Sequence, residues 1–421
     1  MSRAEAYLRQ HLRFNFITNM LDGGAFGLGM GFSSFAAIIP LFVHHLTDSA
    51  LLIGLVPAIH NLGWQLPQLF TAGWVSRARQ YKPLTLWLTI HERVPYLGLA
   101  AIAFFLSQMS SGTALTLVFL MLVWQGLGAG LAANPWTSMI SRIMPDELHG
   151  TFFGAQSAAF NGAAGISAIA AGLILEQVTR PFNLGYSLLF TLTFISMAIS
   201  YIFLALTREP VFEPAEFHRT HILWKKSMDI LRSDKNFRAF LLVRIISQFA
   251  GMGFAFYTIY AVNHFGLSEA AASAMVSVLL IGQILLSPLM GSWGDKWSHR
   301  GVMIIGAFGA ALSAFLAWRA PSANWFYVIF ILESAAIVAI WTIPLAFSVS
   351  FAKKDEDRPL YIGMANTIPA PAAILAPIIG GWIADSAGFQ TTFIVSALCG
   401  VVMAIALYIL VKDSQKTMPM L

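Results

Sequence analysis

The stretch from residue 391 to residue 411 reads TTFIVSALCGVVMAIALYILV and contains no charged side chain. As an α-helix, about 20 apolar residues cross a hydrocarbon layer of about 30 Å. Similar runs recur throughout the 421-residue chain, which is 57% hydrophobic and 11% charged, with a mean hydropathy of +0.70. Soluble domains carry about 25% charged residues. The composition therefore argues against a soluble enzyme or a nucleic-acid-binding protein and predicts a polytopic membrane protein.

Charged residues and clusters of Gly, Pro and Ser divide the chain into twelve predicted membrane-spanning helices. Helices are expected rather than strands because the runs are long, lack alternation of apolar and polar residues, and must satisfy their backbone groups internally. The predicted spans are 14–43, 50–74, 83–107, 112–141, 150–176, 182–206, 237–262, 269–293, 301–319, 324–351, 360–384 and 391–411.

The longest polar interruption, residues 207–236, follows the sixth span. Its apolar residues are spaced among charges in a way that predicts an amphipathic helix lying along the membrane surface. The sequence thus predicts three regions: a six-helix bundle over 1–206, a cytoplasmic linker over 207–236 and a second six-helix bundle over 237–421.

The distribution of basic residues predicts the orientation. Of the 25 Lys and Arg residues, 21 fall on one side of the predicted spans, two (Arg180 and Arg319) on the other, and two (Arg93 and Arg244) inside spans. Because Lys and Arg accumulate in cytoplasmic loops, both termini are expected in the cytoplasm. We expect a multi-pass protein of the cell (inner, cytoplasmic) membrane, whose first span acts as its own insertion signal.

The two halves show an internal repeat. At an offset of 209 residues, Pro135 falls on Pro344 and Glu176 on Asp385, and at an offset of 218 Gln65 falls on Gln283. This register predicts a duplicated six-helix unit. Two similar bundles can enclose a cavity near the bilayer midplane and rock about it, which is typical of secondary transporters.

The loop between the eighth and ninth predicted spans, GSWGDKWSHR at 291–300, resembles a family signature. It is similar to G-x-x-x-D-[RK]-x-G-[RK]-[RK] of the major facilitator superfamily, with Ser298 in place of a glycine and His299 in place of a basic residue. A degenerate first copy begins at Gly73 and has Arg77 where the acid belongs.

This resemblance covers essentially the whole chain and implies a transporter in which spans 1, 4, 7 and 10 line a central cavity. It also implies that the signature loop acts as a cytoplasmic latch between the halves. The corresponding residues are Gly291, Asp295, Lys296, Arg300, Gly73 and Arg77.

Ionisable residues inside the predicted spans are candidates for function because a charge in hydrocarbon is energetically costly. The candidates for proton coupling are Asp22, Glu333, Glu92 and His60. A static ion pair with an arginine of a neighbouring helix is the alternative for Asp22. For Glu92 a structural role is favoured, and because adjacent helical residues point about 100° apart, Glu92 is not expected to pair with Arg93.

Polar and aromatic residues of the spans are candidates for lining a substrate cavity. They are Arg244, Gln248, Gln125, Trp124, Asn134, Trp341, Tyr257, Asn161 and Asn366. Three glycines after Asp22, at positions 23, 27 and 31, repeat every four residues and predict a seam for tight helix packing.

Together these observations predict a secondary active transporter and not an enzyme, without cofactor or metal. The single cysteine, Cys399, excludes an internal disulfide. The expected partners are a small-molecule substrate, protons and the lipid bilayer, with no nucleic acid, and the expected state is a monomer. Proton-coupled export of an amphipathic solute or drug is the main hypothesis. Proton-coupled uptake of an organic anion anchored by Arg244, and a lipid-translocating or non-transporting sensor on the same scaffold, are the alternatives.

Overall fold

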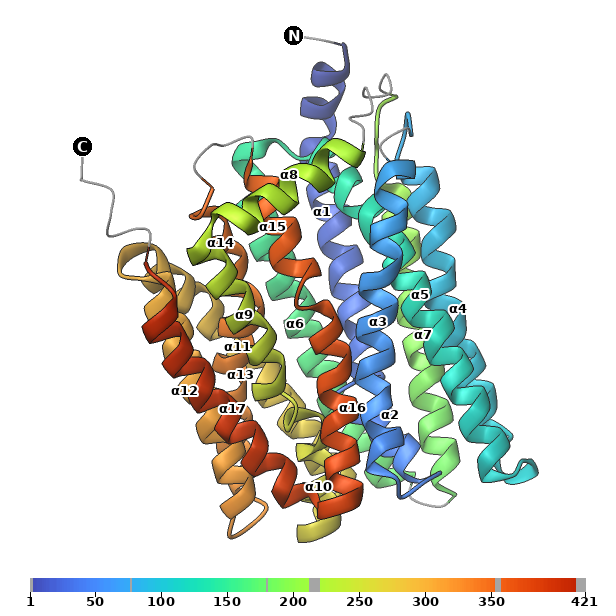
Figure 1. Ribbon diagram of the computed structural model, residues 1–421. Helices are drawn as coiled ribbons and strands as arrows, with labels where there is room; N and C mark the ends of the chain where they lie inside the picture. Colours follow the sequence, from blue (N-terminus) through green and yellow to red (C-terminus); the bar gives the residue numbers. More distant parts are fainter. Residues whose placement is uncertain (1–2, 76–77, 179–180, 212–219, 353–356, 414–421) are drawn as a thin grey trace. The chain divides into compact units, whose positions relative to one another are not determined.

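The computed structural model describes residues 3–75, 78–178, 181–211, 220–352 and 357–413, and all regular secondary structure in these ranges is helical (Figure 1). The first helices are α1 (Arg3–Phe32), α2 (Ile38–His44), α3 (Ala50–Val75), α4 (Lys82–Phe104), η1 (Leu106–Gln108), α5 (Ser111–Ile143), α6 (Asp146–Gln177), α7 (Phe182–Leu206) and α8 (Thr220–Ser233). They are followed by α9 (Lys235–Ala250), α10 (Phe254–Phe265), α11 (Glu269–Lys296), α12 (His299–Arg319), α13 (Trp325–Ile337), η2 (Val338–Thr342), α14 (Ile343–Val349), α15 (Arg358–Thr367), α16 (Ala370–Ala387) and α17 (Phe389–Leu410).

Nine helical stretches within the described residues are long and apolar enough to cross a membrane. The other three predicted spans correspond to α1 with α2, to α3 and to α4, which carry many of the polar residues singled out above. The prediction of a polytopic helical membrane protein is confirmed. The count of twelve spans and the cytoplasmic position of the termini stay predictions.

The chain forms two compact units, each built mainly from one half of the sequence. Unit 1 contains Met1–Asp48, Ile59–His218 and Ser268–Ser277, and unit 2 contains Ser49–Ala58, Arg219–Leu267 and Val278–Leu421. The first turns of α3 and α11 therefore belong to a different unit from the rest of those helices. The predicted region boundaries around 207–236 stay a prediction.

The start of α3 is fixed inside unit 2 by one carboxylate. Asp385, at the end of α16, accepts hydrogen bonds from the Ser49 hydroxyl at 2.8 Å and from the backbone N–H groups of Ala50 and Leu51 at 2.5 and 2.9 Å. The first N–H groups of a helix have no partner within the helix, and a carboxylate is a favourable cap for them. Asp385 thus caps the start of α3 as an N-cap side chain would, although it lies on another helix, α16.

Besides the predicted span 14–43, which is divided into α1 and α2, two further predicted spans are interrupted where the sequence disfavours a continuous helix. The predicted span 237–262 breaks between α9 and α10 at Gly251, and the predicted span 360–384 breaks between α15 and α16 at Pro369. At the first break, Ser396 donates to the Ala250 carbonyl at 2.6 Å and accepts from the Gly253 N–H at 3.3 Å. A neighbouring hydroxyl therefore satisfies the backbone groups that the break releases, as a membrane interior requires.

The glycine seam predicted in the first span is confirmed in unit 1. Gly23, Gly27 and Gly31 of α1 face α6, where Gly23 lies against Gln156, Gly27 against the backbone of Phe160 and Gly31 against Ala164. The facing residues of α6 also repeat every four positions. The absence of side chains at the three glycines lets the two backbones approach closely, as small residues do at membrane helix crossings.

Gly27→Ala is expected to destabilise the protein, because the added methyl group would overlap the Phe160 carbonyl. Overpacking of this kind costs about 1–3 kcal/mol. Gly24→Ala is the matched control, since no atom outside its own helix turn lies within 4 Å of the methyl position. Thermal unfolding in detergent should show a lower midpoint for G27A and an unchanged or higher one for G24A. Equal midpoints would refute the close crossing of α1 and α6.

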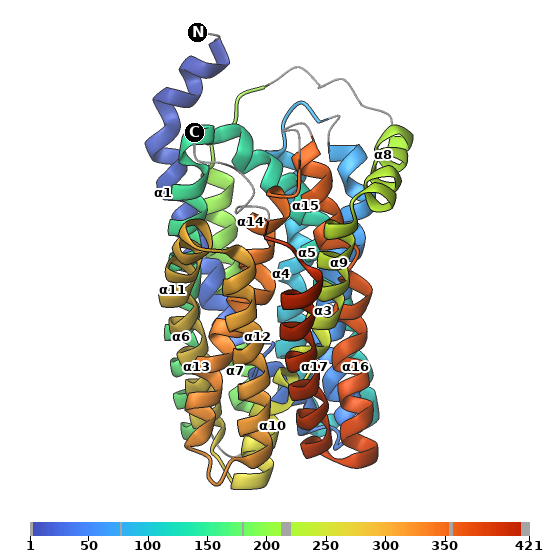
Figure 2. The same ribbon diagram turned by 60° about the vertical axis from the view of Figure 1, so that its left-hand side comes forward.

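Unit 2 is organised around α12, which lies between α13 and α17 (Figure 2). The amphipathic helix predicted in the linker is present as α8, which crosses the ends of the unit 2 helices (Figure 1). Its Ile230 and Leu231 pack against the hydrophobic core of unit 2, and its Lys226 pairs with Asp357 at 2.5 Å. The predicted position along a membrane surface stays a prediction.

Corresponding residues make the same contact in the two units. In unit 1 the Asn15 side chain donates to the Arg208 carbonyl at 2.9 Å and accepts from the Arg208 N–H at 2.8 Å. In unit 2 the Asn236 side chain makes the same two-way contact with Lys412 at 2.9 and 2.7 Å. Each contact joins the first long helix of its unit to the residues that follow the last helix of that unit.

The residues that follow these contacts are both acidic and both hold the start of a helix. Glu209 accepts from the backbone N–H groups of Tyr81 and Lys82 at 2.8 and 2.7 Å, at the start of α4. Asp413 accepts from the hydroxyl of Ser298, the residue that caps α12. The two units therefore share two successive features: the asparagine contact and the acidic residue that follows it and binds the start of a helix.

Candidate functional site

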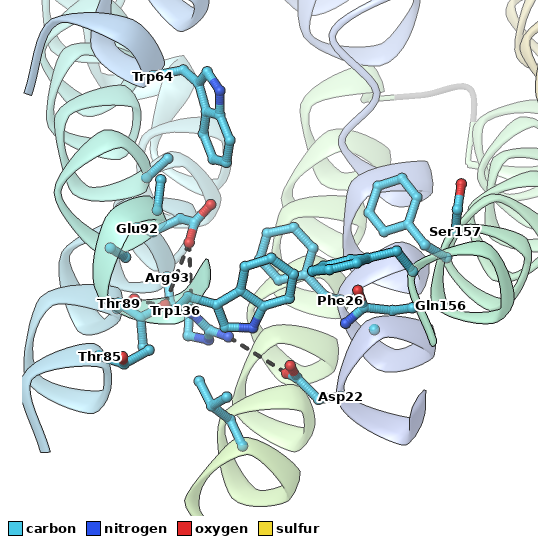
Figure 3. A pocket seen from close by; sticks show the side chains of 17 residues that line it. Asp22, Phe26, Trp64, Thr85, Thr89, Glu92, Arg93, Trp136, Gln156 and Ser157 are labelled. Carbon is cyan, nitrogen blue, oxygen red and sulfur yellow. Dashed lines mark hydrogen bonds and ion pairs between the residues drawn. The ribbon is translucent and has the colours of Figure 1, made fainter. Parts of the chain in front are cut away.

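Unit 1 contains a cavity of about 320 Å³ with charged and aromatic walls (Figure 3). Its lining comes from α1, α3, α4, α5, α6 and α7. The lining residues are Asp22, Gly23, Phe26, Trp64, Thr85, Thr89, Glu92, Arg93, Ala129, Ala132, Ala133, Trp136, Phe153, Gln156, Ser157, Phe160 and Leu204. Two predicted proton-coupling residues, Asp22 and Glu92, thus share one cavity.

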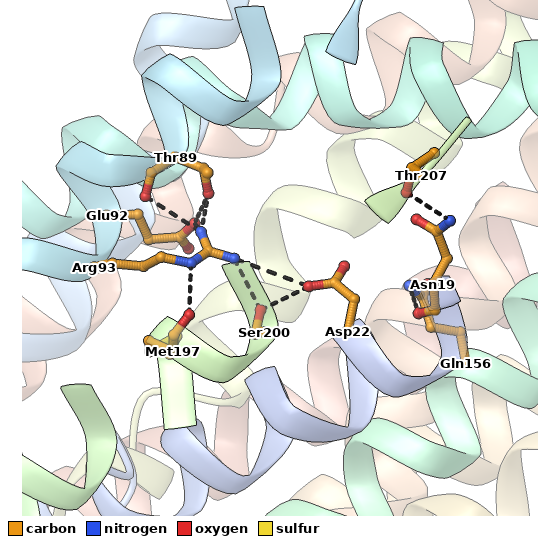
Figure 4. A network of polar contacts seen from close by, with 9 residues as sticks. All are labelled: Asn19, Asp22, Thr89, Glu92, Arg93, Gln156, Met197, Ser200 and Thr207. Atoms are coloured by element: carbon orange, nitrogen blue, oxygen red, sulfur yellow. Dashed lines mark hydrogen bonds and ion pairs between the residues drawn. The ribbon is translucent and has the colours of Figure 1, made fainter. Parts of the chain in front are cut away.

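Asp22 is buried on α1 and meets two polar groups from other helices. The Ser200 hydroxyl of α7 donates to its carboxylate at 2.6 Å, and an Nη atom of Arg93 lies 4.0 Å from the same oxygen. Arg93 also donates to Ser200 at 2.9 Å, so that the hydroxyl bridges the two charges (Figure 4). This arrangement is the ion pair with a neighbouring arginine that the sequence left open as the alternative for Asp22.

Glu92 lies on the other side of the same guanidinium, at 3.7 Å from Arg93 (Figure 4). The prediction that Glu92 and Arg93 do not pair is wrong. Both side chains reach the turn that precedes them, where Thr89 donates to Glu92 at 3.4 Å and accepts from Arg93. The long arginine side chain therefore spans the angle that separates adjacent positions on a helix.

Arg93 is held in place by contacts on every side. Its Nε donates to the Met197 carbonyl at 3.0 Å, and its Cζ lies 5.5 Å from the ring centre of Phe26 and 5.9 Å from that of Tyr201. A guanidinium over an aromatic face gains electrostatic attraction. The cavity thus combines two carboxylates with one well-anchored cation.

A second group of polar contacts lies beside Asp22 on α1. Gln156 of α6, which lines the cavity, donates to the Asn19 carbonyl at 3.4 Å, and the Asn19 side chain donates to Thr207 at 3.1 Å (Figure 4). The buried Asn19 Oδ1 has no hydrogen-bond partner among the described residues. Asn19 is not among the cavity-lining residues, so this group of contacts reaches the cavity through Gln156.

His60, the third candidate in unit 1, does not line this cavity. Its ring stacks on Phe35 with centres 4.1 Å apart, and its Nδ1 lies 3.4 Å from the Gln125 side-chain oxygen. Gln125 is fully buried, and its Nε2 finds no partner among the described residues. His60 and Gln125, predicted for coupling and for the cavity, thus form a separate contact between α3 and α5.

Three further cavity candidates of unit 1 make contacts elsewhere. Trp124 donates to His91 at 3.2 Å, Asn161 donates to Ser157 at 3.3 Å, and Asn134 donates to the Gln68 carbonyl at 2.7 Å. The first and third contacts join α5 to α4 and to α3. Of these three hydrogen bonds, the one made by Asn161 goes to a residue that lines the cavity, Ser157.

In unit 2, Arg244 and Trp341 lie together. Arg244 is buried on α9 and donates to the Ile340 carbonyl, and its Cζ lies 5.9 Å from the ring centre of Trp341. Gln248, one turn later on α9, donates to the Arg244 carbonyl at 3.3 Å and to Ser247 at 3.1 Å. Three of the residues predicted to line a cavity are therefore neighbours.

Glu333 is buried on α13 and faces α12. The Ser313 hydroxyl donates to its carboxylate at 2.7 Å, and the Tyr257 hydroxyl lies 3.4 Å from Ser313. Within the described residues no basic side chain forms an ion pair with Glu333. The structure thus brings Glu333 together with one predicted cavity residue, Tyr257, through the Ser313 hydroxyl between them.

The signature loop makes local contacts within unit 2. Asp295 lies 3.3 Å from His299, and Arg300 donates to the Val411 carbonyl at 2.9 Å. Lys296 is exposed, as is the predicted cavity residue Asn366. Gly291 and Gly73 lie near the ends of α11 and α3, whereas Arg77 lies outside the described residues. The latch function stays a prediction.

Several cavity residues were not singled out from the sequence. They are Gln156 and the aromatic residues Phe26, Phe153 and Phe160. The sequence also did not identify Arg93 as the shared partner of both acids, or Ser200 as a hydrogen-bond partner of Asp22. The spacing of Gln156 and Phe160, one turn apart on α6, was the available signal, but it identifies a helix face and not what that face meets.

Two family models match separate parts of the chain. Residues 240–419 match the Major Facilitator Superfamily and residues 55–210 match the PUCC protein. Multidrug resistance protein 1 of Bacillus subtilis (strain 168) is 25% identical over 146 residues, 34% of this chain and 37% of that protein. The uncharacterized MFS-type transporter YuxJ of the same organism is 23% identical over 133 residues, 31% of this chain and 33% of that protein. The chain thus matches about a third of the length of each relative.

Solved structures match over nearly the whole chain. A mutant of the nucleoside transporter NupG has a TM-score of 0.74 at 16% identity, covering 94% of this chain and 100% of that chain. The D-xylose-proton symporter has a TM-score of 0.74 at 16% identity, covering 96% and 100%. The chain therefore has the helical fold of these solved membrane transporters. The match to the Major Facilitator Superfamily model covers residues 240–419, less than half of the chain.

Proposed function

We propose that the protein is a secondary active transporter that exports an amphipathic small molecule in exchange for protons. The observation that carries this proposal is the sharing of one guanidinium, Arg93, by two buried carboxylates in an aromatic cavity. A single positive charge balances only one of them. The other is favoured as a protonated acid or as the partner of a bound cation.

Proton coupling follows from the energetic cost of charge in the membrane. An unbalanced ionised group at mid-helix costs about 2.5–3.5 kcal/mol on insertion scales. Protonation of Asp22 or Glu92 removes that charge, and a cationic group of the solute balances it. A proton and a cationic solute therefore compete to neutralise the same negative charge in the cavity. Each can drive the exchange only if its affinity differs between the inward-facing and the outward-facing conformation. Glu333 remains a second candidate for coupling.

The walls of the cavity favour a small solute with an apolar or aromatic body. Its volume of about 320 Å³ lies at the lower end of small-molecule sites. Trp64, Trp136 and Phe26 offer ring faces, over which a cation is attracted. The partial likeness to Multidrug resistance protein 1 supports a solute of this type.

The proposed architecture is a duplicated pair of six-helix bundles, over 1–206 and 237–421, with twelve spans and both termini on the cytoplasmic side of the cell membrane. The matching contacts of Asn15 with Arg208 and of Asn236 with Lys412 support the duplication. The excess of Lys and Arg on one side supports the orientation. Alternating exposure of the cavity by two such bundles is the proposed mode of transport.

Proteoliposomes with an imposed pH gradient test this function. We expect the lipophilic aromatic cation ethidium to accumulate on the acidic side, to reverse when the gradient is reversed, and to dissipate when a protonophore is added. A fluorescent phospholipid and an aromatic carboxylate serve as parallel probes. Movement of the lipid alone would favour a lipid translocator, gradient-dependent movement of the carboxylate alone would favour anion uptake, and no movement of any probe would favour a sensor.

A further inference from the structure

Two arginines are buried inside helices of the described chain, and only one of them has an acidic partner. Arg93 in unit 1 is 5% exposed and lies within 4.0 Å of both Asp22 and Glu92. Arg244 in unit 2 is 2% exposed, and no carboxylate of the described residues lies within ion-pair distance of it. The two arginines are therefore similarly buried, but only the charge of Arg93 is balanced by carboxylates.

The contacts of Arg244 leave part of its guanidinium unused. One Nη donates to the Ile340 carbonyl, whereas the buried Nε has no hydrogen-bond partner among the described residues. A buried charge without a counter-ion destabilises the folded protein by several kcal/mol. Ionisable groups inside membrane spans mark substrate and ion pathways, and an anionic ligand would supply the charge that Arg244 lacks.

The surroundings of Arg244 have the form of a binding site. Ile340 and Trp341 lie in η2, a π-helical turn, and such turns are frequent at functional sites. The Trp341 ring lies 5.9 Å from the Arg244 Cζ and is 43% exposed, so that it forms a half-open aromatic cover over the cation. Gln248 adds a side-chain amide one turn further along α9.

We propose that Arg244 and Trp341 form a binding site for a small aromatic carboxylate in unit 2. The planar guanidinium matches the two oxygens of a carboxylate, and the indole provides a surface for the ring. The bound carboxylate supplies the charge that the protein does not, and it competes with the Ile340 carbonyl for the guanidinium. This site shares no residue with the cavity of unit 1, and its occupancy does not depend on the proposed direction or coupling of transport.

Equilibrium binding of radiolabelled benzoate to the full-length protein in detergent tests the site. We expect saturable binding that unlabelled benzoate displaces and that sodium chloride at equal ionic strength does not. Arg244→Gln is expected to weaken binding by at least about 30-fold, since loss of one partner of a buried charge pair costs about 2 kcal/mol or more. Arg319→Gln is the matched control, because Arg319 is exposed in the same unit. The affinity of this variant for benzoate should equal that of the wild type.

A second variant keeps the test valid if R244Q does not fold. Trp341→Leu alters an exposed side chain, and it should weaken benzoate binding several-fold while leaving acetate binding unchanged. Displacement of benzoate by inorganic phosphate, dependent on Arg244, would support the same oxyanion site with a free anion as an alternative occupant. Absence of saturable benzoate binding to the wild type, or equal affinity in R244Q, would overturn the proposal.

Discussion

Asp22→Asn is expected to abolish gradient-driven accumulation of the cationic probe while leaving exchange of labelled for unlabelled probe intact. The amide keeps the size and the hydrogen bond from Ser200 at this position but cannot take up a proton or carry a charge. With one proton exchanged per solute, a gradient of two pH units sustains an accumulation ratio of up to about 100. In D22N the accumulation ratio should fall to about 1, because movement of the solute is no longer coupled to movement of protons.

Asp229→Asn is the matched control for this experiment. Asp229 lies exposed on α8, outside the cavity, and the substitution makes the same chemical change. Glu92→Gln tests which of the two acids carries the proton, since Glu92 shares Arg93 with Asp22. Wild-type accumulation in D22N, E92Q and their double variant would show that the cavity does not couple solute movement to protons.

Arg93→Met is expected to be the most destabilising substitution in unit 1. It leaves Asp22 and Glu92 buried without a cation, and breaking a buried pair by removing one partner costs about 3–5 kcal/mol. Methionine fills much of the volume of arginine, so the loss of stability is attributed to the missing charge and not to an empty space in the packing. Unfolding in detergent by heat or denaturant should show the decrease directly.

The triple variant D22N/E92Q/R93M separates charge from packing. With both acids neutral, the apolar side chain no longer leaves an uncompensated charge, and most of the stability should return. Arg93→Lys should be intermediate, because an ammonium keeps the charge but cannot reach Ser200, Thr89 and the Met197 carbonyl at once. A stable R93M, or a triple variant as unstable as R93M, would contradict the proposed charge balance.

Local features of the fold could be predicted because their signals lie within one helix. The seam at Gly23, Gly27 and Gly31 is a four-residue repeat, and α1 does meet α6 along it. The amphipathic helix α8 follows from apolar residues at helical spacing between charges. Breaks such as that between α15 and α16 were missed because hydropathy over a window does not register Pro369 and Pro371.

The candidate site could be predicted only in part. Asp22, Glu92, Glu333 and Arg244 stand out because charge is rare and costly in a membrane span. Their partners could not be identified from the sequence. Ser200 lies 178 residues from Asp22, and the sequence around a serine on a helix does not indicate which residue its hydroxyl contacts. The pairing of Glu92 with Arg93 was predicted wrongly because helix geometry fixes the direction of Cβ and not the reach of a long side chain.

The sequence by itself determined that this protein is a helical membrane protein, because hydropathy and run length are properties of each segment alone. It also identified the ionisable groups that are predicted to lie within the membrane. Only the tertiary structure decided that Arg93 balances two acids in one cavity whereas Arg244 balances none. That difference depends on the distances between side chains of separate helices, which packing sets and which no single segment encodes.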